Sequence, residues 1–131
     1  MIMAKKVLLV GHCGPDSSYL RMAVRKAEPG AEILMADDPR ELTAAFAKGE
    51  IDLILFNREL GYGWDQPMGV DVIRQLKLTM PHQRMMLVSN YPDAQQAAEA
   101  AGALPGFGKR EIGSARVTEL LKDAIGVKSS V

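Results

Sequence analysis

The chain has 131 residues, and its sixteen lysine and arginine residues balance sixteen aspartate and glutamate residues, so the formal net charge is zero. This length suits a single domain, and a chain without net positive charge lacks the field that attracts a nucleic-acid backbone, so no nucleic-acid partner is expected. A single cysteine excludes an intramolecular disulfide, and the apolar run at 7–10 is too short for a signal-peptide core or a membrane span, which together predict a cytoplasmic protein without membrane contact.

The first predicted unit is a buried strand at Lys6–Val10 followed by an amphipathic helix. Gly11 closes the strand, and Asp16 or Ser17 is the expected cap of the helix. The helix ends at 28–30, where Glu-Pro-Gly interrupts the pattern. Its apolar residues recur at helical spacing and are Leu20, Ala23, Val24 and Ala27.

Four more units of the same kind follow. Their strands are expected at Glu32–Ala36, 51–56, 84–89 and, more weakly, Leu104–Phe107. Their helices are expected from near Pro39, around 70–78, at 93–101, and at a last stripe of Val117, Leu120, Leu121, Ala124 and Ile125. Apolar strands that alternate with helices indicate an α/β domain whose parallel sheet is covered on both faces. We expect one domain at 1–127 and a short tail at 128–131.

Polar or small residues stand just after the predicted strands. Ligands of parallel sheets bind beyond the carboxyl ends of the strands, so these positions are the candidate site. They are Gly11-His12-Cys13, Asp37-Asp38, Asn57-Arg58, Ser89-Asn90 and Gly108-Lys109.

Three stretches carry a resemblance to a known family: DLILFN at 52–57, LVSNYPD at 87–93 and AGALPGFGKR at 101–110. With the five-unit spacing, they resemble the receiver domain of two-component response regulators over about residues 5–126. The resemblance implies a three-layer, doubly wound sheet of the flavodoxin/CheY-like type, with five parallel strands in the order 2-1-3-4-5. In that family an aspartate ending the third strand accepts a phosphoryl group from a histidine kinase. Two acidic residues after the first strand hold magnesium, a serine or threonine ends the fourth strand, and a lysine ends the fifth.

Ser89 and Lys109 match this pattern, but the acceptor position falls on Asn57 and the acidic pair falls on Gly11 and His12. An amide is a far poorer nucleophile than a carboxylate, and magnesium is anchored by carboxylates. The sequence therefore predicts a pseudo-receiver with a vestigial phosphoacceptor pocket and no catalytic residue, metal or cofactor. In such a pocket, the carbonyl oxygen of Asn57 is expected to be the acceptor for Lys109.

Other acids could in principle anchor a cation near this edge. Asp16 lies about one helical turn beyond the first strand and is interpreted as a helix cap. Asp37 and Asp38 follow the second strand. A hard cation needs convergent oxygens, so no metal site is predicted from these residues.

Three features are candidates for partner binding. The loop at 61–69 holds Tyr62 and the only tryptophan, Trp64, so it is either a docking loop or a loop whose rings fold back on its own surface. Phe107 matches the aromatic residue that reports the activation state in receivers, and it could equally be a core residue. The alanine stripe of the fourth helix favours close packing on the sheet.

The stretch GHCGPDSS at 11–18 supports a competing enzyme hypothesis. A glycine-bearing loop before a helix can bind an anion, and Cys13 resembles, more faintly, the cysteine loop of low-molecular-weight tyrosine phosphatases and sugar-phosphotransferase subunits. The arginine of the phosphatase motif would fall on Tyr19, with Arg21 two places too late. An inert Cys13 is the simpler alternative.

These observations predict a phosphorylation-independent signalling adaptor of a two-component pathway. By the family resemblance, its partner would be a kinase, a regulator or an output protein. A second copy of the chain, bound through the fourth helix, fifth strand and fifth helix, is a further expected partner. The alternative is a cysteine phosphotransfer enzyme that uses Cys13.

Overall fold

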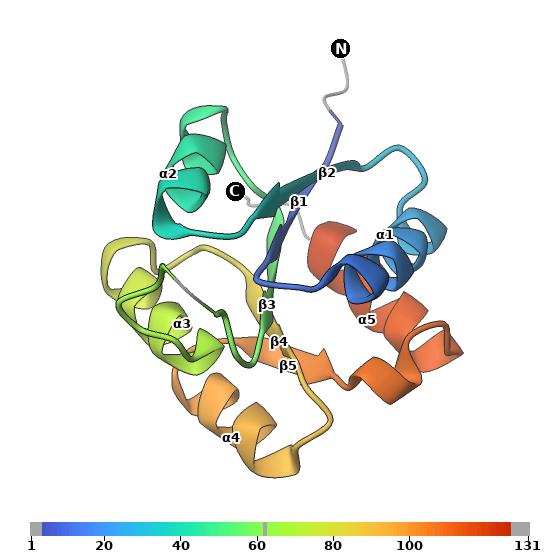
Figure 1. Ribbon diagram of the computed structural model, residues 1–131. Helices are drawn as coiled ribbons and strands as arrows, with labels where there is room; N and C mark the ends of the chain where they lie inside the picture. Colours follow the sequence, from blue (N-terminus) through green and yellow to red (C-terminus); the bar gives the residue numbers. More distant parts are fainter. Residues whose placement is uncertain (1–3, 62, 127–131) are drawn as a thin grey trace.

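A computed structural model describes residues 4–61 and 63–126 (Figure 1). Tyr62 and the tail expected at 128–131 lie outside the described residues. Strands and helices alternate along the chain. The elements are β1 (Lys6–Val10), α1 (Gly14–Ala27), β2 (Glu32–Ala36), α2 (Pro39–Ala47), β3 (Leu53–Asn57), α3 (Gly69–Thr79), β4 (Met85–Val88), α4 (Pro92–Ala100), β5 (Leu104–Phe107), the 3-10 turn η1 (Lys109–Glu111) and α5 (Ala115–Gly126).

The five strands form one parallel sheet in the order β2-β1-β3-β4-β5, which confirms the expected doubly wound topology. Val10 at the end of β1 pairs with Phe56, and Asn57 at the end of β3 pairs with Val88. The carboxyl ends of neighbouring strands therefore meet at one edge of the sheet, as the sequence analysis assumed.

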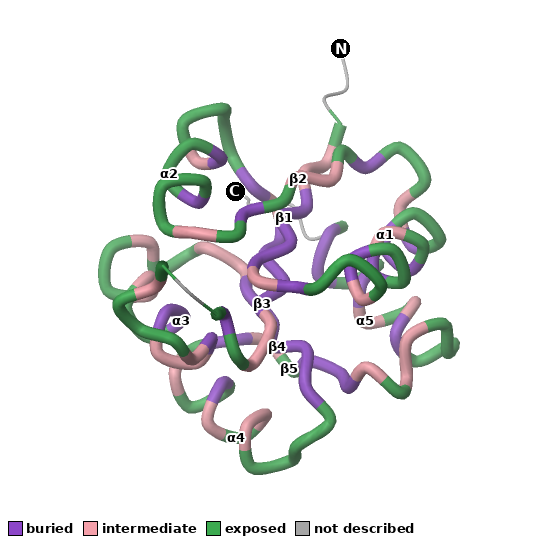
Figure 2. Tube along the Cα trace, in the orientation of Figure 1, coloured by how far each residue is buried: buried purple, intermediate pink, exposed green. Residues whose placement is uncertain are grey.

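Helices cover both faces of the sheet, so the predicted three layers are present (Figure 1). Helices α1 and α5 pack on one face through Leu20, Val24 and Leu121, while α2, α3 and α4 cover the other face through residues such as Leu42 and Ile73. Figure 2 shows the central strands buried between helices whose outer surfaces are exposed. Burial on both sides explains why the strands read as continuous apolar runs.

Two element boundaries differ from the sequence-based expectation in ways that affect the site. Helix α1 begins at Gly14, with Cys13 at the N-cap, because a proline in the first turn has no helical hydrogen bond to lose. Asp16 therefore lies inside the first turn, and its interpretation as the cap is wrong. Strand β3 extends to Asn57, so the amide is the last residue of the strand.

Within residues 4–61 and 63–126, none of the helices combines the length and the hydropathy that a membrane span requires.

Candidate functional site

A pocket of about 280 Å³ lies at the carboxyl ends of β3, β4 and β5. Asn57 ends β3, Ser89 directly follows β4, and Lys109 begins η1 just after β5. All three side chains line the pocket, together with Arg58, Glu59, Val88, Asn90 and Tyr91. The structure thus brings together three residues that the sequence analysis assigned to one site.

The Asn57 amide has a structural role that a carboxylate could not fill. Its Nδ2 donates to the carbonyl oxygen of Gly11 at 3.1 Å and to the carbonyl oxygen of Glu59 at 2.8 Å. These bonds hold the loop after β3 against the end of β1. An ionised aspartate has only acceptor oxygens and would meet two carbonyl oxygens without a proton between them. The asparagine is therefore matched to the backbone around it.

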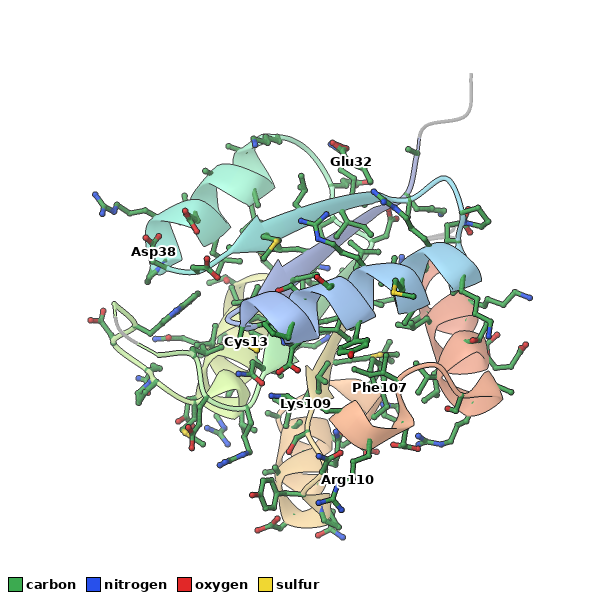
Figure 3. The ribbon with its side chains drawn as sticks, turned by 45° about the vertical axis from the view of Figure 1, so that its right-hand side comes forward. Cys13, Glu32, Asp38, Phe107, Lys109 and Arg110 are labelled. Atoms are coloured by element: carbon green, nitrogen blue, oxygen red, sulfur yellow. The ribbon has the colours of Figure 1, made fainter. Side chains whose placement is uncertain are left out.

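Lys109 pairs with Asp16 rather than with Asn57. Its Nζ lies 2.8 Å from Oδ2 of Asp16, so the expectation that Asn57 is its acceptor is wrong. This hydrogen bond is the main reason that the pKa of Asp16 is lowered from its ordinary value of 3.8; a hydrogen bond with the Cys13 thiol lowers it further, while partial burial opposes the shift. An ionised carboxylate attracts the ammonium more strongly than an amide dipole does, and the first turn of α1 brings that carboxylate within reach. Figure 3 shows Cys13 and Lys109 at the same edge of the sheet.

By the resemblance to receiver domains, Gly11 and His12 fall at the positions that are acidic in that family. Gly11 has a φ of 77°, and a Cβ added there would lie 2.7 Å from Cδ2 of Leu60. His12 is 6% exposed, and its Nε2 lies 2.8 Å from the carbonyl oxygen of Leu55. Because a carbonyl only accepts, Nε2 carries the proton and donates it.

The other ring nitrogen of His12, Nδ1, is buried and has no hydrogen-bond partner within the described part of the chain. Burial lowers the pKa of His12 below its ordinary value of 6.5; the hydrogen bond to Leu55 and the charge of Asp16 oppose this shift, and the charge of Lys109 adds to it. The imidazole is therefore neutral at pH 7. A neutral imidazole here packs as a core residue with one hydrogen bond.

The receiver fold implies a divalent cation at this edge, and the residues present do not fit one. Gly11 and His12 supply no carboxylate. The other two nearby acids are already paired: Asp16 with Lys109, and Glu59 with Arg58, whose Nη2 lies 3.1 Å from Oε1 of Glu59. Across residues 4–61 and 63–126, no three His, Cys, Asp or Glu side chains converge closely enough to hold a metal. Hard cations need several convergent oxygens, and this edge does not offer them.

The pair Asp37-Asp38 serves the start of α2. Oδ1 of Asp38 accepts from the amide of Glu41 at 2.8 Å, and Oε1 of Glu41 accepts from the amide of Asp37 at 2.6 Å. This reciprocal arrangement satisfies two backbone donors at the helix start. Asp38 is therefore a helix cap, and neither acid lines the pocket.

Among the partner-binding candidates, Trp64 folds back on the protein. Its Nε1 donates to the carbonyl oxygen of Asp37 at 2.9 Å, and the half-buried ring packs against the core under α2 and α3. Phe107 is 1% exposed and belongs to the core under α1 and α5. In this conformation it is a core residue rather than a surface contact.

One contact at the pocket was not predicted from the sequence, although Arg58 is among the candidate positions named there. Arg58 lies over the ring of Tyr91, with its guanidinium carbon 4.6 Å from the ring centroid, within cation–π range. Tyr91 is 56% exposed, so this pair forms part of the outer rim of the pocket. Arg58 follows β3 and Tyr91 comes after the neighbouring strand β4, so the sequence indicates that the two residues are close. It does not specify that their side chains stack.

Cys13 is exposed at the N-cap of α1. The nearest candidate arginine in sequence, Arg21, instead directs Nη2 to the sulfur of Met35 on β2, at 2.9 Å. Arg21 therefore does not supply the guanidinium clamp with which a cysteine phosphatase binds phosphate.

Comparison with solved structures finds receiver domains. One is the signal receiver domain of a DNA-binding response regulator from Colwellia psychrerythraea 34H, with a TM-score of 0.74, 16% identity, and coverage of 94% of this chain and 99% of that chain. Another is a response regulator from Thermotoga maritima, with a TM-score of 0.71, 19% identity, and coverage of 95% and 100%. A third is the beryllofluoride-activated NtrC4 receiver domain dimer, with a TM-score of 0.72, 18% identity, and coverage of 95% and 98%.

No family model and no curated protein matches the sequence. The three structural similarities extend over nearly the whole of each chain at below 20% identity, so they establish the fold. The protein has the receiver-domain fold of two-component response regulators.

Proposed function

We propose that this protein is a receiver-like signalling adaptor that acts through protein contacts and does not accept a phosphoryl group. The proposal rests on the hydrogen bonds and the ion pair that Asn57, Asp16 and Lys109 make at the carboxyl end of the sheet. Asn57 is a neutral amide that donates to two carbonyls, and Lys109 pairs with the carboxylate of Asp16. An amide is too poor a nucleophile to take the place of the aspartate.

The electrostatics of the pocket support the same proposal. Phosphoryl transfer depends on positioning and on neutralising the charge of the phosphate oxygens. Here Lys109 is paired with Asp16 and Arg58 with Glu59, so each cation of the pocket already has an anion beside it. A surface that keeps the receiver shape without this chemistry can still present its helices and loops to another protein.

The proposed partners are a kinase, a regulator or an output protein of a two-component pathway, with a second copy of the chain as a further possibility. The beryllofluoride-activated NtrC4 receiver domain, which has the same fold, is a dimer. For this chain the expected dimer surface comprises α4, β5 and α5. Sedimentation at several protein concentrations tests that expectation.

Intact mass spectrometry tests the proposed function. The protein is incubated with acetyl phosphate and magnesium, and separately with a histidine-phosphate donor, beside a receiver domain that retains its aspartate as a positive control. The expected result is an unchanged mass for this protein and one added phosphoryl group for the control. A phosphoryl group found on any residue of the pocket would overturn the proposal.

The same experiment tests the alternative, a cysteine phosphotransfer enzyme. That enzyme would acquire one phosphoryl group on Cys13, and a Cys13→Ser variant would lose the labelling. The exposure of Cys13 at the start of α1 permits such a reaction sterically. An adduct located at Cys13 would replace the adaptor proposal with this alternative.

A further inference from the structure

A second pocket, of about 290 Å³, lies between α2 and α3, away from the strand ends. Leu42 of α2 and Val72 of α3 are buried at its base, and Trp64 and Leu76 form partly buried walls. Pro39, Asp65, Gln66, Gln75 and Thr79 complete the lining. We call this feature the α2–α3 groove. Pockets that enclose a whole drug-sized molecule measure roughly 300–1,000 Å³, so a groove of this size suits side chains of a larger partner.

The wall formed by Trp64 is fixed in place. The indole Nε1 donates to the backbone of Asp37, and the backbone of Gly63 comes close to Asp38, since a Cβ added at Gly63 would lie 3.7 Å from Cβ of Asp38. The loop therefore rests on the start of α2 while one part of the indole lines the groove. A large aromatic ring held in one orientation loses little conformational entropy on binding, which is why such residues often contribute strongly to interfaces.

Acidic residues surround one end of the groove. Asp65 lines it directly, and Asp37, Asp38 and Glu41 lie at the start of α2, against which Trp64 is held. Figure 3 shows Asp38 at the beginning of α2, beside the loop. Arg40 is the only cation among residues 37–41.

These four carboxylates are not neutralised within the part of the chain that the structure describes, where no lysine, arginine or histidine pairs with them. Asp38 and Glu41 accept hydrogen bonds from backbone amides, and these bonds leave their negative charge in place. An apolar groove beside uncompensated negative charge is complementary to a ligand that is both apolar and cationic.

We propose that the α2–α3 groove binds a basic amphipathic helix of a partner protein. Apolar side chains of the helix would enter between Leu42, Leu76 and Trp64, and its lysine or arginine residues would meet Asp65 and the acids at the start of α2. Recognition of an amphipathic helix by an apolar groove is a common mode of peptide binding. The inference specifies a partner for the adaptor proposed above, but it involves neither Asn57 nor Lys109.

Peptide titrations with Trp64 fluorescence test this proposal, because Trp64 is the only tryptophan of the chain. The probe is a leucine–lysine peptide of about 18 residues, long enough to form a helix, with its leucines on one face. A leucine–glutamate peptide with the same pattern and a leucine–lysine peptide of scrambled order are the controls. The expected result is a saturable fluorescence change with the patterned basic peptide only.

A pair of variants assigns the binding to the groove. Asp37→Lys combined with Asp65→Lys is expected to weaken the affinity for the basic peptide about tenfold, since each exposed charge pair contributes modestly. Glu119→Lys, a single charge reversal on the exposed surface of α5, is the control and is expected to leave the affinity unchanged. Circular dichroism establishes that both variants remain folded.

Three results would overturn the inference: no binding of the basic peptide, equal binding of the acidic peptide, or equal weakening by Glu119→Lys. Amide chemical-shift changes confined to α1 or to α4, β5 and α5 would likewise contradict it. The proposed lack of phosphorylation would stand in each of these cases, because mass spectrometry tests it separately.

Discussion

At the carboxyl ends of β3 to β5, the pocket holds an amide that donates to two carbonyls and a lysine that lies 2.8 Å from Asp16. In the α2–α3 groove, the apolar lining is open and the nearby Asp37 and Asp65 have no cation beside them within the described chain. Polar groups that are already hydrogen-bonded or ion-paired with one another gain little favourable free energy from binding a ligand. Unpaired charges beside an apolar surface gain more, because the ligand supplies the missing partners. Under the proposed function, we therefore expect the pocket at the strand ends to be structural and contact with a partner to occur elsewhere.

The largest loss of stability is expected when an acid is placed at Gly11, the first residue after β1. Gly11→Asp forces a side chain into a conformation with a φ of 77° and brings its Cβ to 2.7 Å from Leu60. We expect the free energy of unfolding to fall by about 2 kcal/mol, the cost typical of strained backbone at a non-glycine residue. Urea unfolding followed by circular dichroism measures it.

Gly14→Ala is the matched control for that substitution. Gly14 begins α1, and a Cβ there would meet no atom within 4 Å, so the change is expected to shift stability by less than about 1 kcal/mol. Equal unfolding midpoints for Gly11→Asp and the native protein would show that the first position is free to carry an acid.

A smaller effect on stability is expected from protonation of the buried imidazole of His12 as the pH falls. Because burial lowers the pKa of His12, the unfolded chain binds a proton near the ordinary value of 6.5, while the folded chain binds it only at a lower pH. Stability is therefore expected to be level above that value and to fall as the pH drops from 7 towards 5. His12→Gln, which retains a donor for the carbonyl of Leu55, should reduce this slope.

Unfolding titrations at several pH values measure the slope, and His82→Gln supplies the control. His82 is the only other histidine, and His82→Gln removes an exposed imidazole while leaving the buried His12 in place. An identical slope in His12→Gln and the native protein would contradict the neutral, buried state of His12.

The ion pair between Lys109 and Asp16 is expected to make a still smaller contribution to the free energy of unfolding. Their side chains are 36% and 24% exposed, so solvent screens the pair and the coupling is expected to be about 0.5 kcal/mol. A double-mutant cycle with Asp16→Asn and Lys109→Gln measures this coupling at low salt and again at high salt. A coupling of zero at both salt concentrations would show that the two groups do not pair in solution.

The sequence predicted the fold well because the strands are buried on both faces and the helices carry regular apolar stripes. Ser89, Asn57 and Lys109 could be placed together because each lies at or just beyond the carboxyl end of a strand of a parallel sheet. The pairing of Lys109 with Asp16 was missed because it depends on where α1 begins, and the proline in the first turn moves that start to Gly14.

The arrangement of Trp64 could not be predicted for a different reason. Its hydrogen bond goes to the backbone carbonyl of Asp37, and every residue offers such an acceptor. No residue pattern therefore distinguishes this loop conformation from one in which the ring projects into solvent.

The central claim is that the pocket has lost both its acceptor and its cation site, and the phosphorylation of an Asn57→Asp variant tests this claim most directly. The substitution restores the carboxylate, but Gly11 and His12 still offer no anchor and Asp16 remains paired with Lys109. After incubation with acetyl phosphate and magnesium, intact mass spectrometry is predicted to show an unmodified protein. Stoichiometric labelling of Asp at position 57 would contradict the account, because other acids would then be supplying the metal ligands.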